Sequence, residues 1–358
     1  MTADFPTWIT ADDGVITATG WGTPPPDAIH EAGSVLVPAF VDLQVNGVGT
    51  DDLAVADDDG WLRVARRLAH AGVGAWCPTL VTSPRDAYEP FLVRAERVRA
   101  ACSAAGLPEI LGVHLEGPFL APEAAGAHDP AWITPADPAW MAHLLDAHPS
   151  VIRVVTLAPE ADPDGACTRL LATRGVTVSI GHTRASGSAT RVLVDAGATA
   201  ATHLFNAMAP LHHREVGSAG VALTDPRVRA TLIADGVHVA PSAVRIAFAA
   251  TDRLAVVSDC VATDASRVSQ GDAVRLAESN TLAGATVLLD GAVENLCRWG
   301  VSFERAIDAV TRVPAALVGA SHRGTLAPGA PADVVACDPT SGAIRAVWHR
   351  GRRSHHIG

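Results

Sequence analysis

Five side chains that could bind a metal ion or move a proton follow short apolar runs of the sequence. They are Glu116, His182, His203, His238 and Asp259. Two imidazoles and one carboxylate form a common catalytic zinc set, which leaves a position open for water. Such an ion lowers the pKa of water and polarises a carbonyl group, and a nearby carboxylate that is not a ligand can act as general base. The residue types therefore predict metal-dependent hydrolysis, with Asp259 as the base.

These side chains can act together only if the elements before them converge. The middle of the chain alternates short apolar runs with Ala- and Arg-rich stretches at 60–72, 87–106 and 302–313, which predicts a parallel sheet covered by helices. Eight such runs predict an α/β fold of the (β/α)8 barrel type, in which the carboxyl ends of all strands meet at one mouth. The expected strands are residues 40–47, 74–80, 109–117, 152–160, 176–183, 198–205, 229–238 and 253–260.

The two ends of the chain differ from its middle in their sequence pattern. Residues 1–37 and 325–358 contain short strand-like pieces separated by Gly and Pro, and neither end is long enough for a core of its own. We therefore expect both ends to pair into one small β-sandwich domain. The catalytic barrel would then occupy residues 38–324.

Composition excludes several classes of protein. A net charge of −11 disfavours a nucleic-acid partner, and no apolar run approaches the roughly 20 residues of a membrane span. All 27 basic residues are arginine, which excludes a Lys Schiff base, a P-loop Lys and a carboxylated Lys bridging two metals. The start of the chain does not resemble a signal peptide, and the six cysteines are scattered, which is typical of reduced thiols. A cytoplasmic protein is expected.

Several short segments together resemble the N-acetylglucosamine-6-phosphate deacetylases of the amidohydrolase superfamily. They occur in the family's order: "LVPAFVDLQVNG", "HLEGPFL", "GAHDP", "SIGHT", "THLFNAM", "IADGVHV", "VVSDCVA" and "GTLAPGAPADVV". The resemblance spans roughly residues 34 to 340 and is strongest in "HLEGPF" followed by "THLFNAM". It implies the same barrel and β-sandwich, and the hydrolysis of N-acetyl-D-glucosamine 6-phosphate to glucosamine 6-phosphate and acetate.

The resemblance also implies roles for individual residues. Glu116, His182 and His203 would bind the metal, and Asp259 would take a proton from the attacking water and pass it to the departing amine. His128 would hydrogen-bond the acetyl carbonyl and stabilise the developing oxyanion. The residues that would contact the substrate are Gln44, Asn46, Ala127, His128, Asn206, Ala207, Arg214 and His238. Arg214 would come from a neighbouring subunit, which implies a homodimer.

The first expected strand departs from many relatives in the superfamily. These relatives have His-x-His on that strand and bind a second metal with it, whereas this chain has Gln44 and Asn46. Amide side chains are weak metal ligands, and no Lys is present to bridge two ions. One divalent ion per subunit is therefore expected, with Zn²⁺ favoured and Fe²⁺ or another divalent ion accepted by the same ligands.

Two alternatives stay open from the sequence. The enzyme could instead deacetylate N-acetylgalactosamine 6-phosphate or another N-acyl substrate, since the loops at 209–220 and 262–285 would shape the pocket. A catalytically inactive barrel scaffold is the other alternative, and the retained carboxylates and histidines argue against it.

Overall fold

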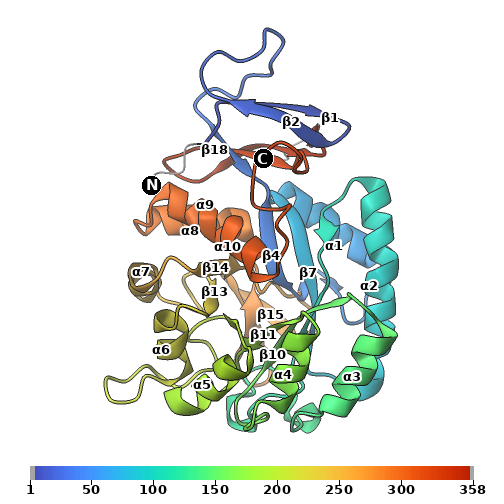
Figure 1. The fold of residues 1–358 in the computed structure, drawn as a ribbon, viewed down its shortest axis with the longest axis vertical. Helices are drawn as coiled ribbons and strands as arrows, with labels where there is room; N and C mark the ends of the chain where they lie inside the picture. Colours follow the sequence, from blue (N-terminus) through green and yellow to red (C-terminus); the bar gives the residue numbers. More distant parts are fainter. Residues whose placement is uncertain (1–4, 355–358) are drawn as a thin grey trace.

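The computed structural model describes residues 5–354, and its central feature is a barrel of parallel strands (Figure 1). The strand order is β14-β13-β12-β11-β10-β9-β7-β4, with β8 added beside β7. The ring closes between its two ends, because Asp259 N donates to Gln44 O at 3.0 Å and Asn46 N donates to Cys260 O at 2.9 Å. The predicted (β/α)8 barrel is confirmed. The strands are β4 (Phe40–Val45), β7 (Val73–Val81), β8 (Glu109–Ile110), β9 (Val113–Glu116), β10 (Ile152–Leu157), β11 (Thr177–Ile180), β12 (Ala200–Ala201), β13 (Arg229–Ile233) and β14 (Leu254–Val257).

Helices surround the strands, and several begin at a side chain that caps the first turn. Asp57 accepts from Gly60 N at the start of α1, and Ser186 accepts from Ala189 N at the start of α5. Such caps satisfy backbone N–H groups that have no partner inside the helix. The α-helices are α1 (Asp58–His70), α2 (Arg85–Ala105), α3 (Pro138–Ala147), α4 (Ala166–Thr173), α5 (Gly187–Ala196), α6 (Gly217–Thr224), α7 (Pro241–Ala250), α8 (Leu289–Arg298), α9 (Phe303–Val310) and α10 (Arg312–Leu317), and the 3-10 turns are η1 (Pro122–Ala124) and η2 (Pro130–Trp132).

Large aromatic side chains fill the layer between helices and barrel. Trp61 of α1 and Trp76 of β7 are fully buried, with ring centroids 6.3 Å apart. Phe91 of α2 packs against Trp61 at 5.0 Å. This layer anchors the first two helices to the strands that carry the site. All six cysteines are free, and among residues 5–354 no helix combines the length and the apolar composition needed to cross a bilayer.

Several strands end earlier than the sequence pattern predicts. The expected strand at 198–205 is paired only over β12, and the expected strand at 229–238 only over β13. Positive φ angles at His203 (31°) and Phe205 (77°) take the backbone out of the extended region directly after β12. Strand propensity cannot reveal these turns, because non-Gly residues rarely adopt such angles.

The two ends of the chain form a small β domain at one end of the molecule, as Figure 1 shows by the blue and red strands lying together. Strand β3 pairs antiparallel with β18, so N-terminal and C-terminal segments share one sheet. The predicted terminal β domain is confirmed, while its boundaries at 37/38 and 324/325 remain a proposal. Residues 1–4 and 355–358 of those segments lie outside the described part. The strands are β1 (Trp8–Asp12), β2 (Val15–Gly20), β3 (Val35–Pro38), β18 (Val334–Cys337), β19 (Ile344–His349) and β20 (Arg352–Ser354).

An antiparallel three-stranded sheet follows β14, and we call residues 267–285 the flap. Its strands β15 (Arg267–Gln270), β16 (Ala273–Leu276) and β17 (Leu282–Ala285) pair in chain order. Ala285 N donates to Asp259 O at 3.1 Å, which attaches the flap to the barrel mouth. A short hairpin of β5 (Gly47–Val48) and β6 (Asp51–Asp52) lies between β4 and α1.

Candidate active site

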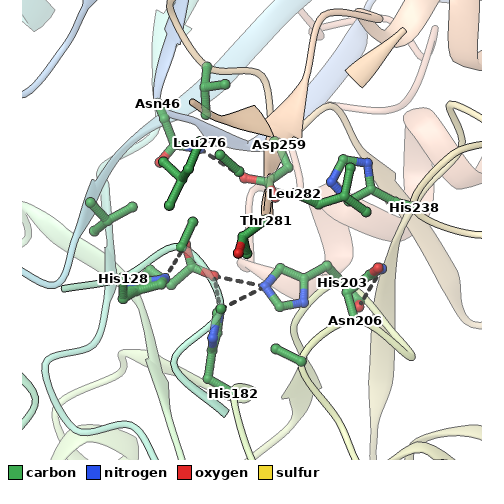
Figure 2. A pocket seen from close by; sticks show the side chains of 18 of the residues that line it. Asn46, His128, His182, His203, Asn206, His238, Asp259, Leu276, Thr281 and Leu282 are labelled. Atoms are coloured by element: carbon green, nitrogen blue, oxygen red, sulfur yellow. Dashed lines mark hydrogen bonds and ion pairs between the residues drawn. The ribbon is translucent and has the colours of Figure 1, made fainter. Parts of the chain in front are cut away.

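Glu116, His182 and His203 meet at the mouth of the barrel, at the carboxyl ends of β9, β11 and β12. Glu116 Oε1 lies 2.9 Å from His203 Nε2 and 3.3 Å from His182 Nε2. The two Nε2 atoms are 3.1 Å apart. All three side chains are buried, and their ligand atoms lie within 4.8 Å of one another. The three side chains predicted as metal ligands are therefore brought together. Figure 2 shows His182 and His203 facing each other at this place.

The protonation of this cluster fits a cation. His182 Nδ1 lies 2.9 Å from Ala124 O, and a carbonyl can only accept, so the ring proton is on Nδ1. Nε2 is the ring nitrogen that faces the cluster, and a backbone carbonyl that holds Nδ1–H in this way orients the ring as in metal-ligating histidines. Oxygen and nitrogen atoms of three buried side chains thus lie within hydrogen-bond distance of one another. Two imidazoles and one carboxylate are a donor set that suits a divalent ion.

The backbone is in the left-handed region at His182, His203 and Asp259. The φ angle is 46° at His182, 31° at His203 and 48° at Asp259. Such angles are uncommon for residues other than glycine and concentrate at functional sites, where the surrounding structure holds them. The turns end the strands and direct these three side chains into the mouth of the barrel.

Asp259 is oriented by Asn46 from the neighbouring strand end. Asn46 Nδ2 donates to Asp259 Oδ1 at 2.8 Å, and Asp259 N donates to the backbone carbonyl of Gln44. Burial and the negative charge of Glu116 raise the pKa of Asp259 well above its usual range. A carboxylate with a raised pKa can take up a proton and release it again near neutral pH.

Gln44 holds the carboxylate of Glu116 in the way that Asn46 holds that of Asp259. Its Nε2 donates to Glu116 Oε1 at 3.1 Å, and the side chain is only 1% exposed. Gln44 and Asn46, the two amides in place of a His-x-His pair, are therefore each committed to a carboxylate of the site. Asp42, on the same strand, lies deeper and accepts from Gln44 N and Ser258 N.

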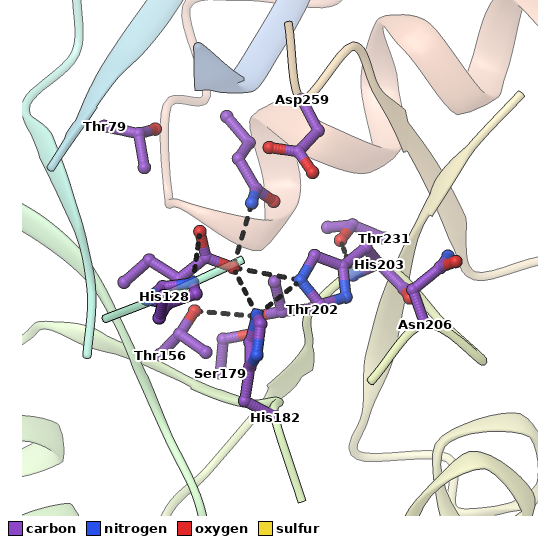
Figure 3. Close-up of polar contacts among 12 residues, drawn as sticks. Thr79, His128, Thr156, Ser179, His182, Thr202, His203, Asn206, Thr231 and Asp259 are labelled. Atoms are coloured by element: carbon purple, nitrogen blue, oxygen red, sulfur yellow. Dashed lines mark hydrogen bonds and ion pairs between the residues drawn. The ribbon is translucent and has the colours of Figure 1, made fainter. Parts of the chain in front are cut away.

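A buried polar network supports the cluster from below (Figure 3). His114 bonds Leu43 O through Nδ1 at 3.0 Å and Thr156 Oγ1 through Nε2 at 2.7 Å. Thr156 bonds Thr202 at 2.7 Å, and Thr202 bonds Ser179 at 2.6 Å. These contacts tie β9, β10, β11 and the residue after β12 together beneath the three predicted ligands, and Leu43 O adds β4. Burial lowers the pKa of His114, which keeps the ring neutral.

His128 reaches the cluster from the loop after β9, with its ring against that of His182. Thr82 N lies 3.2 Å from His128 Nδ1, and because a backbone N–H can only donate, Nδ1 is the acceptor. The proton of the neutral ring is then on Nε2, which lies 3.7 Å from Glu116 Oε2. Burial is the main cause that lowers the pKa of His128 to about 3. His128 is therefore a neutral hydrogen-bond donor into the site.

A cavity of about 490 Å³ lies over these groups. The predicted substrate residues that line it are Asn46, Ala127, His128, Asn206, Ala207 and His238. His238 is held by Asp235, whose Oδ2 lies 2.6 Å from His238 Nδ1. Gln44 lies below the cavity, and Arg214 does not line it in its own chain: the Arg214 side chain is exposed and bonds His213 at 2.8 Å.

Two contributions to the site were missed in the sequence. Thr82 sets the tautomer of His128, and Arg184 lines the cavity from the turn after β11. Arg184 stands two residues after His182 in "GHTRAS", and this place in a strand-to-helix loop could have marked it. The flap residues Leu276 and Thr281 to Gly284 also line the cavity. They belong to the loop at 262–285 that was expected to shape the pocket, although no motif marks them in the sequence.

The arrangement is that of a barrel hydrolase with a candidate metal site, and comparison with known proteins agrees with this class. The model of the Amidohydrolase family matches residues 35–353, and the chain belongs to that family. The N-acetylglucosamine-6-phosphate deacetylase of Danio rerio is 36% identical over 328 residues, which are 85% of this chain and 80% of the fish protein. The N-acetylgalactosamine-6-phosphate deacetylase of Escherichia coli O157:H7 is 34% identical over 356 residues, or 95% and 92% of the two chains.

A solved structure shows the same similarity in three dimensions. It is a mutant N-acetyl-D-glucosamine-6-phosphate deacetylase of Mycobacterium smegmatis in complex with N-acetyl-D-glucosamine-6-phosphate. Its TM-score is 0.88 at 32% identity, and the match covers 97% of this chain and 94% of the mycobacterial chain.

Proposed function

We propose that this chain hydrolyses the N-acetyl group of N-acetyl-D-glucosamine 6-phosphate to give D-glucosamine 6-phosphate and acetate. The observation that carries the proposal is the convergence of Glu116, His182 and His203 below one cavity, with Asp259 and His128 at its sides. The names of the relatives supply the substrate class.

Glu116, His182 and His203 would hold one divalent ion, most suitably Zn²⁺, although Fe²⁺ accepts the same donors. When bound, the ion supplies Lewis-acid chemistry, which lowers the pKa of water and polarises the acetyl carbonyl. Gln44 and Asn46 are engaged with Glu116 and Asp259, so a second ion would have to compete with these hydrogen bonds. This supports a single ion per chain.

Asp259 serves as general base and then as general acid. Asn46 occupies its Oδ1, so Oδ2 is the oxygen available to take a proton from the attacking water. The water oxygen forms the new bond to the acetyl carbon. The C–N bond then breaks, and the proton on Asp259 passes to the amine nitrogen, which leaves as the product amine.

His128 stabilises the charge that develops on the carbonyl oxygen. Its Nε2–H points toward the Glu116 side of the site, and its neutral state is maintained by burial. A fixed donor in a water-poor site stabilises an oxyanion more than water does, because it needs no reorganisation during the reaction.

Ala127, Asn206, Ala207 and His238 would hold the sugar phosphate along the cavity wall. We also propose a homodimer in which Arg214 reaches the site of the neighbouring subunit. Its exposed position outside the cavity of its own chain is compatible with that role.

The test is acetate release from a panel of N-acetylglucosamine and N-acetylgalactosamine, each with and without the 6-phosphate. The proposal expects the highest kcat/KM for N-acetylglucosamine 6-phosphate. A preference for N-acetylgalactosamine 6-phosphate would instead support the alternative activity, for which the Escherichia coli relative is named. Equal activity on unphosphorylated sugars would overturn the sugar-phosphate assignment, and no hydrolysis with any added divalent ion would support an inactive scaffold.

A further inference from the structure

Three arginines line the cavity, and they differ in the partners of their guanidinium groups. Arg267 of the flap is ion-paired with Asp52 and Asp264. Arg275, also in the flap, donates to the flap's own Asn280 O at 2.8 Å. The Arg184 guanidinium donates to Met208 O at 2.8 Å and, like that of Arg275, forms no ion pair with a carboxylate among residues 5–354. Cations without an ion-pair partner that face a cavity, in a chain of net charge −11, need an explanation.

We propose that Arg184 binds the 6-phosphate of the substrate from within the same subunit, an inference that rests on the proposed function. A phosphate monoester carries close to two negative charges at neutral pH, and the planar guanidinium fork matches its oxygens. Arg184 would thereby be a specificity-determining residue in addition to any arginine that a second subunit supplies.

Its position makes Arg184 a better candidate than Arg275 for binding the phosphate. The turn that carries Arg184 lies against the segment after β12: Thr183 N donates to Ala207 O at 2.9 Å, and the Arg184 side chain bonds the next carbonyl, that of Met208. Asn206 and Ala207 of this segment line the same cavity. Arg184 therefore lies beside the backbone proposed to hold the sugar phosphate, whereas Arg275 is bonded only within the flap.

The turn around Arg184 is held in place independently of its guanidinium. Glu160 Oε1 accepts from Arg184 N, and Glu160 Oε2 accepts from Thr183 Oγ1, both at 2.7 Å. The backbone is thus fixed while the side chain remains exposed. A charge held on a rigid turn loses less entropy on binding than one on a mobile loop.

The nearest alternative anion site, the amino end of α5, is already occupied by the Glu215 carboxylate. The amino end of α5 follows this turn, and helix amino ends commonly bind phosphate. Here Gly187 N donates to Glu215 Oε1 at 2.8 Å, and Ser186 caps Ala189 N. A phosphate would have to displace the Glu215 carboxylate to use these amides. Arg184 is therefore the accessible cationic group on this wall.

The experiment compares Arg184→Ala and Arg184→Gln with a matched control, Arg191→Ala. Arg191 is an exposed arginine of α5 that does not line the cavity, so its loss removes the same charge from the same segment. Kinetics are measured with N-acetylglucosamine 6-phosphate and with unphosphorylated N-acetylglucosamine. Binding of glucosamine 6-phosphate and of glucosamine is measured by calorimetry.

We expect both Arg184 variants to raise KM for the phosphorylated substrate, and Kd for its product, by roughly 10- to 100-fold, the loss typical of a hydrogen bond to a charged group. Activity on the unphosphorylated sugar should be unchanged, and Arg191→Ala should match wild type. Equal losses on both sugars would mean that Arg184 only supports the loop, and wild-type KM for the phosphorylated sugar would likewise overturn the inference. A wild-type enzyme that hydrolyses no phosphorylated sugar would instead overturn the proposed function.

Discussion

Asp42 provides a prediction whose size can be calculated from the structure. Its carboxyl group is fully buried on β4, where Oδ1 accepts from Gln44 N at 3.3 Å and Ser258 N at 3.2 Å. Oδ2 has no hydrogen-bond partner among the described residues. Burial raises the pKa of Asp42 from 3.8 to about 6, since the hydrogen bonds only partly offset the desolvation of the charge.

The raised pKa makes the fold less stable when Asp42 ionises. Between pH 3.8 and about 6 the folded chain holds a proton on Asp42 that the unfolded chain releases, so the free energy of unfolding falls as pH rises through this window. Below it both states are protonated, and above it both are ionised. A shift of about two pKa units at about 1.4 kcal/mol each gives a loss of about 3 kcal/mol.

Asp42→Asn should remove this pH dependence, because the amide cannot ionise. Urea unfolding of wild type and variant at pH 4, 5, 6 and 7.5 isolates the effect, since all other groups titrate in both proteins. Relative to the variant, the wild type should lose about 2.4 kcal/mol between pH 4 and 7.5, because the unfolded chain has already released much of the Asp42 proton at pH 4. Asp12→Asn, at an exposed position of β1, is the control and should show a constant difference. A constant difference for Asp42→Asn, or one that grows in favour of wild type with pH, would refute the reasoning.

Three further predictions concern the site. Asp259→Asn should keep binding of glucosamine 6-phosphate but lower kcat by about 10²- to 10⁴-fold, and a near wild-type kcat would remove Asp259 as the base. His203→Ala should lower the metal content per chain measured by mass spectrometry, while His143→Ala, an exposed histidine of α3, should leave it unchanged; equal content in both would count against His203 as a ligand. His128→Ala should lower kcat about 10²- to 10³-fold with little change in KM, and a purely KM effect would reassign it to substrate binding.

The barrel and the convergence of Glu116, His182 and His203 could be predicted because both leave local signals in the sequence. Alternating apolar and helical segments indicate parallel strands, and the carboxyl ends of such strands must meet at one mouth. Glu116, His182 and His203 each follow a strand, so convergence follows from topology without knowledge of any contact. The lengths of the strands could not be predicted, since the left-handed turn at His203 is fixed by tertiary packing.

The finer features of the site depend on contacts between distant segments. Thr82 and His128 are 46 residues apart, so the tautomer of the ring has no signal in either segment. Asn46 and Asp259 are 213 residues apart and meet because the barrel closes between β4 and β14. The sequence showed that Gln44 and Asn46 replace the His pair of many relatives. The structure adds what each amide does: Gln44 donates to Glu116, and Asn46 donates to Asp259.

The most direct test of the account is a metal titration of chelator-treated protein, followed by acetate release from N-acetylglucosamine 6-phosphate. We predict negligible activity without metal and a linear rise that reaches its plateau at one equivalent of Zn²⁺ per chain. His182→Ala should show no such plateau at one equivalent. A wild-type plateau at two equivalents, or full activity of the metal-free protein, would contradict a single-ion site built from Glu116, His182 and His203.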